Sequence, residues 1–408
     1  MTEQTTTLRD RIYSIDLLRG IVMMIMLLDH TREFVHAGAL TSDPTDPATT
    51  TAAVFFTRWI THFCAPIFVF LSGVSIYLQK ANGKTNGELS WFLVTRGLWL
   101  VFLEFTLIRF LIVFNLDYTF FGMAQVIWVI GISMIVMAAL IYLPVRIIGI
   151  AGVLMIVLHN LLDRFSLPPN IAFAATPPPD ALQTLWIILH QQAILPLFGG
   201  ASTALLAYPL IPWVGVMAAG YALGTLYSLE RDTRQKWLLR LGMAATALFV
   251  ILRAINVYGD PVPWKYQDTS VATVLSFFNV SKYPPSLAFL LMTIGPGMIV
   301  LALTDRIDAK SLWQRICVTF GRVPMFYYIL QWLTAHSMGV ILSALAGKQI
   351  GYLFVGILAM GQAAPPNYGF SLAITYAAWI SGLIILYPLC KWWSGVKSRN
   401  KHWALGYL

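Results

Sequence analysis

The sequence predicts an all-α fold: a polytopic membrane bundle of about ten or eleven helices with both termini in the cytoplasm. Composition is the first observation behind this prediction, because 58% of the 408 residues are hydrophobic and only 11% are charged. The second is the mean hydropathy of +0.71, since a soluble domain of this length would have to expose much of that apolar surface to water. The third is a series of apolar runs close to 20 residues long, the length that crosses a bilayer as a helix.

The first run, SIDLLRGIVMMIMLLDHTREFVH at 14–36, carries charged residues near both ends. Its uncharged centre, GIVMMIMLL, would be roughly 14 Å long as a helix, against about 30 Å of hydrocarbon. The whole segment is long enough to span, so the charged residues belong to the spanning helix. An ionised side chain inside a bilayer costs at least about 2.5 kcal/mol. We therefore expect these charges to face the interior of the bundle.

The other spans follow in order along the chain. With the first, the predicted spans lie at about 15–36, 55–79, 91–114, 121–143, 145–162, 201–227, 237–255, 284–304, 316–343 and 370–391. Two shorter apolar segments, 182–198 and 350–361, are expected to be interfacial or re-entrant, and one of them is the candidate for an eleventh span. The domains are then a cytoplasmic segment 1–14, one transmembrane domain 15–391 and a cytoplasmic tail 392–408.

Lysine and arginine set the expected orientation. Most of the 27 fall in segments that are cytoplasmic when both termini are inside, as the positive-inside rule requires. This distribution accounts for the net charge of +9, so nucleic acid is not an expected partner. The predicted location is the cell (inner) membrane, as a multi-pass protein. Cys64, Cys317 and Cys390 have neither disulfide nor metal-site spacing, and we expect packing roles for them and no bound metal.

A polar stripe marks the second half of the first span. On a helical wheel, one face about 100° wide holds four ionisable residues: Asp29, Arg32, Glu33 and His36. His30 and Arg19 lie on the adjoining flank. One interpretation is a structural cluster in which the two carboxylates neutralise Arg32. The other is catalytic, because a carboxylate seven residues before a histidine fixes its tautomer and raises its basicity. Asp29 would then prepare His36 as a general base or transient acyl acceptor.

Further polar residues are expected at the same two depths in the membrane, that of Arg19 and that of the polar stripe. They are Glu104, Arg109, Gln125, Arg253, Asn256, Lys282 with the adjacent Tyr283, and His336. Glu104 and Arg109, both in the third span, are expected either to pair with each other or to bind substrate. His62, near the external end of the second span, is expected either to face His36 or to be a satisfied interfacial histidine. The remaining histidines, His159, His190 and His402, have no charged companions nearby and receive no role.

Several segments together resemble one known family. In chain order they read RIYSIDLLRG, LLDHTREFVHAG, WITHFCAPIFVFLSG, QVIWVIGISM, YPLIPWVGVMAAGY, NVYGDP, NVSKYPPSLAFLLMTIGPG and GRVPMFYYILQ. They are similar to bacterial membrane proteins related to the catalytic domain of heparan-α-glucosaminide N-acetyltransferase, within the transmembrane acyltransferase superfamily. The similarity extends from about Arg11 to His336.

This resemblance implies a bundle of ten or eleven helices that takes an acetyl or other acyl group from cytoplasmic acyl-CoA and delivers it across the membrane. It also implies that a histidine after the first span is catalytic. Its context FKHA is similar to FVHA here, which assigns the role to His36, with His30 as the competitor. One departure lies in the ninth span, where Gln331 replaces a histidine of the relatives and His336 keeps their second one. Glutamine cannot take a proton near neutral pH, so no proton relay is expected there.

The cytoplasmic end of the first span is the predicted site of the acyl donor. Arg11, Asp16 and Arg19 lie there, and guanidinium groups suit the phosphates of CoA. Arg11 is equally well explained as a positive-inside anchor. We expect Arg19→Ala to weaken use of the donor more than use of the acceptor.

The predicted function is an acyltransferase, acetyl-CoA-dependent, that modifies an extracytoplasmic sugar amine or hydroxyl of a glycan or envelope precursor. Its expected partners are the bilayer, acyl-CoA and that acceptor, with a homodimer left open. His36 would either deprotonate the acceptor for direct attack on the thioester or carry the acyl group itself. The alternative is a proton-coupled secondary transporter, because intramembrane charges also mark ion pathways, although the sequence has no inverted repeat. A non-catalytic scaffold would leave the polar stripe unexplained.

Overall fold

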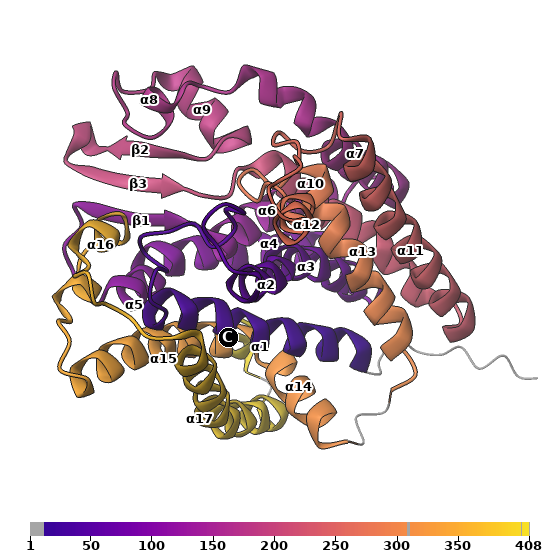
Figure 1. The fold of residues 1–408 in the computed structure, drawn as a ribbon. Helices are drawn as coiled ribbons and strands as arrows, with labels where there is room; N and C mark the ends of the chain where they lie inside the picture. Colours follow the sequence, from indigo (N-terminus) through magenta and orange to yellow (C-terminus); the bar gives the residue numbers. More distant parts are fainter. Residues whose placement is uncertain (1–11, 308–310, 401, 408) are drawn as a thin grey trace, which may run out of the picture.

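A computed structural model describes residues 12–307, 311–400 and 402–407 (Figure 1). Arg11, one of the residues expected to bind the donor, lies outside the described residues. The first elements are α1 (Tyr13–Val35), α2 (Ala52–Ile60), η1 (Thr61–Phe63), α3 (Cys64–Ala81), α4 (Asn86–Leu103), η2 (Glu104–Ile108), α5 (Arg109–Val113), β1 (Phe120–Ala124), α6 (Val126–Leu140), α7 (Val145–Leu158) and η3 (His159–Phe165).

The elements of the remaining chain include two further strands and the C-terminal helices. They are α8 (Pro169–Ala172), α9 (Ala181–His190), β2 (Ala193–Leu197), η4 (Phe198–Gly200), β3 (Ser202–Leu206), α10 (Leu210–Leu223), η5 (Gly224–Ser228), α11 (Arg231–Ile255), α12 (Ser270–Phe278), α13 (Leu287–Thr304), α14 (Leu312–Arg322), α15 (Pro324–Leu345), η6 (Gly351–Phe354), α16 (Ile357–Ala363), α17 (Leu372–Arg399) and η7 (Trp403–Gly406).

Seven helical stretches in the described part of the chain are long and apolar enough to cross a membrane. They are Ala52–Ala81, Val145–Phe165, Leu210–Ser228, Arg231–Ile255, Leu287–Thr304, Pro324–Leu345 and Leu372–Arg399. Helices α11 and α17 expose large apolar side chains, such as Ile251 and Ile384, which suits contact with lipid rather than water. The chain is therefore a multi-pass membrane protein, and the count of ten or eleven spans stays a prediction.

Helix α1 is not one of these seven apolar stretches, because it carries several charged residues. It nevertheless lies at the centre of the bundle. Its 23 residues rise about 35 Å, enough to cross the hydrocarbon core, and most of its side chains are buried. It packs against α3, α13, α14, α15 and α17. The charged residues of α1 are thus enclosed by other helices, as the sequence predicts.

The contact between α1 and α14 brings two helix backbones together. A Cβ atom on Gly20 would lie 1.8 Å from the carbonyl oxygen of Cys317, and one on Gly321 would lie 1.9 Å from the carbonyl oxygen of Asp16. Glycine at both positions permits this approach, as small residues do at other membrane helix interfaces. The start of α1 is therefore packed directly against the backbone of α14.

The ninth predicted span, 316–343, is two helices in the structure. Helix α14 begins with a capping box between Ser311 and Gln314 and ends at Arg322. Val323 leaves the helical conformation, and Pro324 begins α15. Proline suits the first turn of a helix, because the N–H that it lacks would have no helical partner there. The apolar pattern continues through this break, which is why the sequence predicts a single span.

The prediction of an all-α fold is wrong in one place. Strands β1, β3 and β2 form a small sheet in that order, with β1 parallel and β2 antiparallel to β3 (Figure 1). The strands occupy the starts of predicted spans 121–143 and 201–227 and the end of segment 182–198. Apolar runs this short do not distinguish a strand from a buried helical turn by pattern. Only pairing between distant segments reveals the sheet.

The two segments expected to be interfacial or re-entrant contain short helices. Segment 182–198 contains most of α9 and all of β2, and segment 350–361 contains η6 and most of α16. Neither α9 nor α16 is long enough to span the membrane. Helix α16 lies beside β1, since a Cβ on Gly356 would lie 3.0 Å from the Cβ of Phe120. We call this end of the bundle, where α1 ends, the sheet face. The opposite end, where α1 begins, is the N-terminal face.

Candidate active site

One side of α1 carries a line of chemically distinct residues from the N-terminal face towards the sheet face. At 100° per residue they fall within an arc of about 60°: Arg19, Met26, His30 and Glu33. This side differs from the predicted stripe, which is centred on Asp29. Two cavities meet this line of residues, one at each end.

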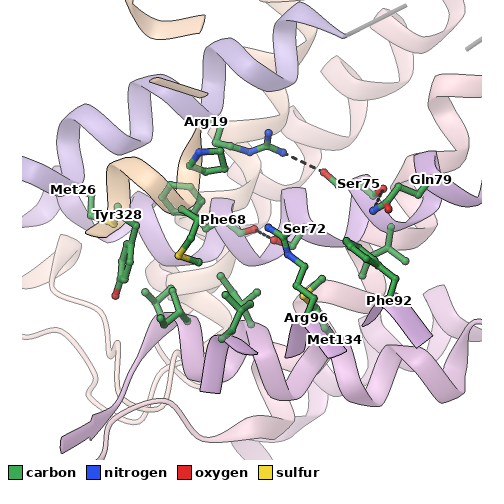
Figure 2. Close-up of a pocket in the computed structure, with 17 residues that line it drawn as sticks. Arg19, Met26, Phe68, Ser72, Ser75, Gln79, Phe92, Arg96, Met134 and Tyr328 are labelled. Atoms are coloured by element: carbon green, nitrogen blue, oxygen red, sulfur yellow. Dashed lines mark hydrogen bonds between the residues drawn. The ribbon is translucent and has the colours of Figure 1, made fainter. Parts of the chain in front are cut away.

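The first cavity, of about 240 Å³, opens beside the start of α1 and is called the arginine cavity here. Its polar lining comes from α1, α3 and α4: Arg19, Ser72, Ser75, Gln79 and Arg96. Figure 2 shows Arg19 and Arg96 on opposite walls, with Arg19 donating to Ser75 Oγ at 3.1 Å. Met26 and Tyr328 lie at the other end of the cavity, towards the sheet face. The cavity is thus cationic at one end and mostly apolar at the other.

The second cavity, of about 600 Å³, is an open groove on the sheet face, called the α16 groove here. Its walls are the end of α1, the loop 39–41 and α16. Glu33 contributes the only charged side chain among the described residues that line it. The groove therefore meets the same side of α1 as the arginine cavity, at the other end of the line.

His30 lies between the two cavities. Met26, four residues earlier, lines the arginine cavity, and Glu33, three residues later, lines the α16 groove. His30 Nδ1 is 2.9 Å from Glu33 Oε2, and its ring centroid is 3.6 Å from that of Trp332. Because a carboxylate accepts and does not donate, Nδ1 carries the proton and Nε2 keeps a lone pair. His30 is therefore oriented as a base.

Buried polar atoms near this pair have no hydrogen-bond partner among the described residues. They include the Tyr328 hydroxyl, Trp332 Nε1 and Glu104 Oε1. The other oxygen of Glu104 accepts from the backbone N–H of Trp128 at 2.9 Å, at the start of α6, where the helix dipole favours a carboxylate. Leaving a buried polar atom unpaired costs about 1–3 kcal/mol. Such atoms are able to bond a substrate that reaches the centre of the bundle.

Glu104 lies on η2, a π-helical turn within the otherwise α-helical segment 86–113. Such turns are frequent at functional sites because they redirect side chains. The expected pairing of Glu104 with Arg109 is wrong. Arg109 instead donates to backbone carbonyls of the 115–120 segment before β1. The π turn is followed by this arginine, which holds the loop that leads into the sheet.

Asp29 belongs to a separate ion cluster beside the line of residues. Its carboxylate accepts a hydrogen bond from Arg58 of α2 and lies 3.6 Å from Arg32. Arg58 also donates to Thr61 Oγ1 at 3.2 Å. The predicted pairing of Asp29 with Arg32 is confirmed, whereas Glu33 bonds His30 instead. All three charged groups of the cluster are largely buried, so loss of one leaves another uncompensated. The cluster joins α1 to α2.

His36 lies outside the helix that the sequence analysis extended to it. Helix α1 ends at Val35, and His36 is extended, with φ −80° and ψ 133°, and bridges to Phe370. Its Nδ1 has no hydrogen-bond partner among the described residues. Asp29 is bound to arginines, so the expectation that it fixes the tautomer of His36 is wrong. Partial burial and the nearby Arg32 guanidinium lower the pKa of His36 and keep the imidazole neutral.

Lys282, Tyr283 and His62 lie around the Asp29 cluster. The Lys282 ammonium is 5.2 Å from the ring centroid of Tyr283. His62 packs against Phe289, with ring centroids 5.4 Å apart, and its nearest charges include Arg58 and Lys282. The structure thus places His62 with this cluster, and no contact between His62 and His36 is found among the described residues.

The other predicted site residues bond neighbouring protein groups. Asp16 accepts from Arg19 at 3.4 Å. Arg253 donates to carbonyls of the 276–279 segment, and Asn256 bonds the backbone of Trp264. These two residues hold the loop between α11 and α13. Their substrate-binding role stays a prediction.

Gln125 and His336 differ in how they are bonded. Gln125 precedes α6, and its Nε2 is buried without a partner among the described residues. His336 Nδ1 donates to the Leu111 carbonyl at 3.0 Å, and its ring stacks between Phe34 and Phe114, with centroids 4.4 and 3.9 Å away. His336 is therefore packed as a core residue that links α1, α5 and α15.

Sequence reasoning missed four residues of this region. They are Arg58, Arg96, Tyr328 and Trp332. Arg58 interrupts the apolar run AAVFFTRWI four residues before His62, so a signal was present. Arg96 lies near the start of the predicted span 91–114, where the positive-inside rule already explains a positive charge. The two aromatic residues give no such signal, because aromatic side chains in membrane spans commonly serve packing.

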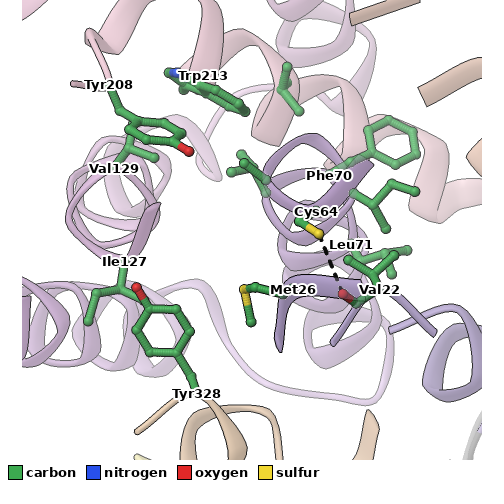
Figure 3. Close-up of a cluster of buried hydrophobic side chains, with 14 of the residues drawn as sticks. Val22, Met26, Cys64, Phe70, Leu71, Ile127, Val129, Tyr208, Trp213 and Tyr328 are labelled. Atoms are coloured by element: carbon green, nitrogen blue, oxygen red, sulfur yellow. Dashed lines mark hydrogen bonds between the residues drawn. The ribbon is translucent and has the colours of Figure 1, made fainter. Parts of the chain in front are cut away.

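Apolar packing closes the interior around the site. Figure 3 shows Met26 of α1, Cys64 of α3 and Tyr328 of α15 within one cluster that also includes Tyr208 and Trp213. Cys64 donates to the Val22 carbonyl at 3.5 Å. The three cysteines are buried and unpaired, so the expected packing role is confirmed.

His159 and His190 are not isolated, contrary to the sequence analysis. Asp163 Oδ1 lies 2.9 Å from His190 Nε2, and the two histidine rings are 5.8 Å apart. This group lies in η3 and α9 and is separate from the line of residues on α1.

The first part of the chain matches a known protein family. The family model described as "Heparan-alpha-glucosaminide N-acetyltransferase, catalytic" matches residues 11–258. No curated protein matches the chain. The matched residues include α1, α3, α4 and α6, which provide most of the walls of the arginine cavity.

Proposed function

The chain belongs to the heparan-alpha-glucosaminide N-acetyltransferase catalytic family, and from this premise we propose that it moves an acetyl group from cytoplasmic acetyl-CoA to a sugar amine or hydroxyl on the other side of the membrane. The observation that carries the proposal is the continuous side of α1. It places Arg19 and Met26 in the arginine cavity, Glu33 in the α16 groove and His30 between them. Donor and acceptor thus approach one histidine from opposite ends.

The N-terminal face is cytoplasmic in this proposal, because lysine and arginine are concentrated there. The arginine cavity then opens to the side where acetyl-CoA is made available. Single cysteines at positions 45 and 85, in a chain whose native cysteines are replaced, test this orientation. An impermeant thiol reagent added from outside should label position 45 and leave position 85 unmodified. Labelling of position 85 alone would reverse the orientation.

The donor fits the arginine cavity by its chemistry. Arg19 and Arg96 offer guanidinium groups to the phosphates of CoA, with Ser72 and Gln79 as further hydrogen-bonding groups. The apolar end near Met26 accepts the pantetheine arm and directs the thioester towards His30. The acceptor reaches His30 from the α16 groove.

His30 performs the proton transfer in the proposed reaction. Its Nε2 takes a proton from the acceptor amine or hydroxyl as that atom attacks the thioester carbonyl, while Glu33 stabilises the imidazolium that forms. The carbon–sulfur bond then breaks, and the proton passes to the departing sulfur, which gives acetylated acceptor and CoA thiol. A route in which the imidazole first carries the acetyl group has the same overall balance. His36, the first choice from sequence, lacks the paired carboxylate and the position between the cavities.

The test uses the purified chain in nanodiscs with radiolabelled acetyl-CoA and glucosamine as a surrogate acceptor. We expect label in the acceptor and release of one CoA thiol for each acetyl group transferred. His30→Ala should abolish both signals, whereas His36→Ala should keep them. Turnover that is lost in His36→Ala and kept in His30→Ala would return the role to His36. A folded protein that transports solute but neither hydrolyses nor transfers the acetyl group would be a permease.

A further inference from the structure

A second group of ligand-type side chains lies apart from the proposed active site. His159 and Asp163 come from η3, directly after α7, and His190 is the last residue of α9. One ligand atom from each of the three lies within 4.8 Å of the others. Two imidazoles and a carboxylate are thus brought together from segments that are separated by the 166–180 loop.

The hydrogen bonding within this group is incomplete. Both ring nitrogens of His159 and Nδ1 of His190 have no partner among the described residues, although each histidine is only 1% exposed. Packing alone does not account for a fully buried imidazole with two unpaired nitrogens, because each unpaired polar atom costs about 1–3 kcal/mol. A cation bound to one nitrogen of each ring and to the Asp163 carboxylate would satisfy one of the two unpaired nitrogens of His159.

We propose that His159, Asp163 and His190 bind one Zn²⁺ ion. Imidazole nitrogen and carboxylate oxygen are both ordinary zinc ligands, at about 2.0–2.2 Å from the metal. Around a tetrahedral ion, ligand atoms at such distances are separated by about 3.3 Å. The ligand atoms of the three residues lie within 4.8 Å of one another, so zinc would draw them together by up to about 1.5 Å. Water completes the fourth position, because the Asp163 side chain is 21% exposed and opens the site on one side.

Neighbouring groups orient the carboxylate for this role. Asn160 Nδ2 donates to Asp163 Oδ2 at 2.8 Å, so the other oxygen, Oδ1, faces His190, and zinc would replace the hydrogen bond between Oδ1 and His190 Nε2. Asn160 Oδ1 accepts from the backbone N–H of Leu287 at 2.9 Å, so the same side chain connects the group to the start of α13. Hydrogen bonds of this kind fix the direction of metal ligands and are a regular part of metal sites.

The proposed ion would fasten the short elements near the sheet to the helix bundle. Two residues separate His190 from β2, an edge strand of the sheet, and His159 directly follows α7. Zinc would tie these two parts together, and removing it should loosen α9 and β2. This is a structural role that requires no part of the proposed acetyl transfer. It contradicts the expectation of no metal, which rested mainly on the spacing of the cysteines.

The test measures bound metal in the full chain, purified with an affinity tag that contains no histidine. After zinc loading and removal of free ion, elemental analysis should give about one zinc per chain, and thermal unfolding should shift upward with zinc concentration, as binding to the folded state requires. His159→Ala and Asp163→Asn should lose most of the zinc, because each variant removes one of the three protein ligands. His402→Ala, a substitution of an exposed histidine elsewhere, should keep it.

Three results would overturn the proposal. One is a folded wild-type chain that holds no zinc after loading. Another is undiminished zinc in His159→Ala. The third is an unfolding temperature that responds equally to zinc in the wild-type and Asp163→Asn chains. If the variants do not fold, the wild-type measurement alone still decides, because the chain either holds the ion through gel filtration or does not.

Discussion

Two histidine–carboxylate pairs of equal length lie in different surroundings. His30 Nδ1 to Glu33 Oε2 and His190 Nε2 to Asp163 Oδ1 are each 2.9 Å. The first pair forms within one helix and lies between two cavities. The second joins segments 27 residues apart and adjoins another buried histidine. The length of the pair therefore does not indicate its role, whereas the third group beside it does.

A cavity and a second imidazole have different chemical consequences. Where substrate can approach, a histidine with one nitrogen bonded to a carboxylate is a general base. Where a second unpaired imidazole lies beside the pair instead, the three side chains together can serve as ligands of a metal ion. Four measurements test this difference between the two pairs.

Replacing the histidine of each pair should give opposite results. His30→Ala should lower turnover by roughly 10²–10⁴-fold, the usual contribution of general acid–base catalysis, with little change in bound zinc. His190→Ala should lower bound zinc and the unfolding temperature. Acetyl transfer per folded molecule and metal content are measured on the same preparations. Equal loss of turnover in both variants, at equal stability, would remove the distinction between the pairs.

Replacing Glu33 tests whether the first pair acts as a unit. Glu33→Gln keeps the size of the side chain but removes the charge that stabilises the imidazolium, and a hydrogen bond to a charged group contributes about 1.5–3 kcal/mol. We expect kcat to fall roughly tenfold to a hundredfold, because the imidazolium that forms during the reaction loses its anionic partner. An unchanged kcat would show that the carboxylate takes no part in the reaction.

The arginine cavity provides the third measurement. Arg96→Ala should raise the KM for acetyl-CoA about fivefold, since a guanidinium in an open cavity contributes about 1 kcal/mol, and should leave the KM for the acceptor unchanged. Arg240→Ala is the matched control, because Arg240 is exposed on α11 and does not line the cavity. A changed acceptor KM with an unchanged donor KM would place the donor elsewhere.

Replacing His36 should have the smallest effect, and that effect should be on stability rather than on turnover. Its pKa is lowered in the folded chain, so the unfolded chain binds the proton more readily as the pH falls. Stability is therefore lost as the pH falls below about 6.5. His36→Gln should remove a few tenths of a kcal/mol of this loss. Unfolding temperatures of both chains at several pH values provide the measurement, and parallel curves would contradict it.

The sequence predicts local relationships well and contacts between distant segments poorly. Asp29 and Arg32 are three residues apart on one helix, so their pairing follows from spacing alone. Arg58 also bonds Asp29, but nothing in the spacing of α1 and α2 brings those two residues together. The helical wheel wrongly places His36 on the polar stripe, because the helix ends one residue earlier, at Val35. Helix ends are the least predictable feature of a span. The three strands are not predicted for the same reason as the Arg58 contact, because both depend on segments that are distant in the sequence.

The close backbone contact of α1 with α14 has a consequence for how a group crosses this membrane. Transporters that work by alternating access rock one bundle against another. Such rocking at this contact would press the backbone at Gly20 into Cys317 and that at Gly321 into Asp16, because no side chain is present at either glycine to yield. With α1 fixed in this way, the proposed transfer would not use rocking of α1. The acetyl group would pass along a fixed helix from the arginine cavity to the α16 groove.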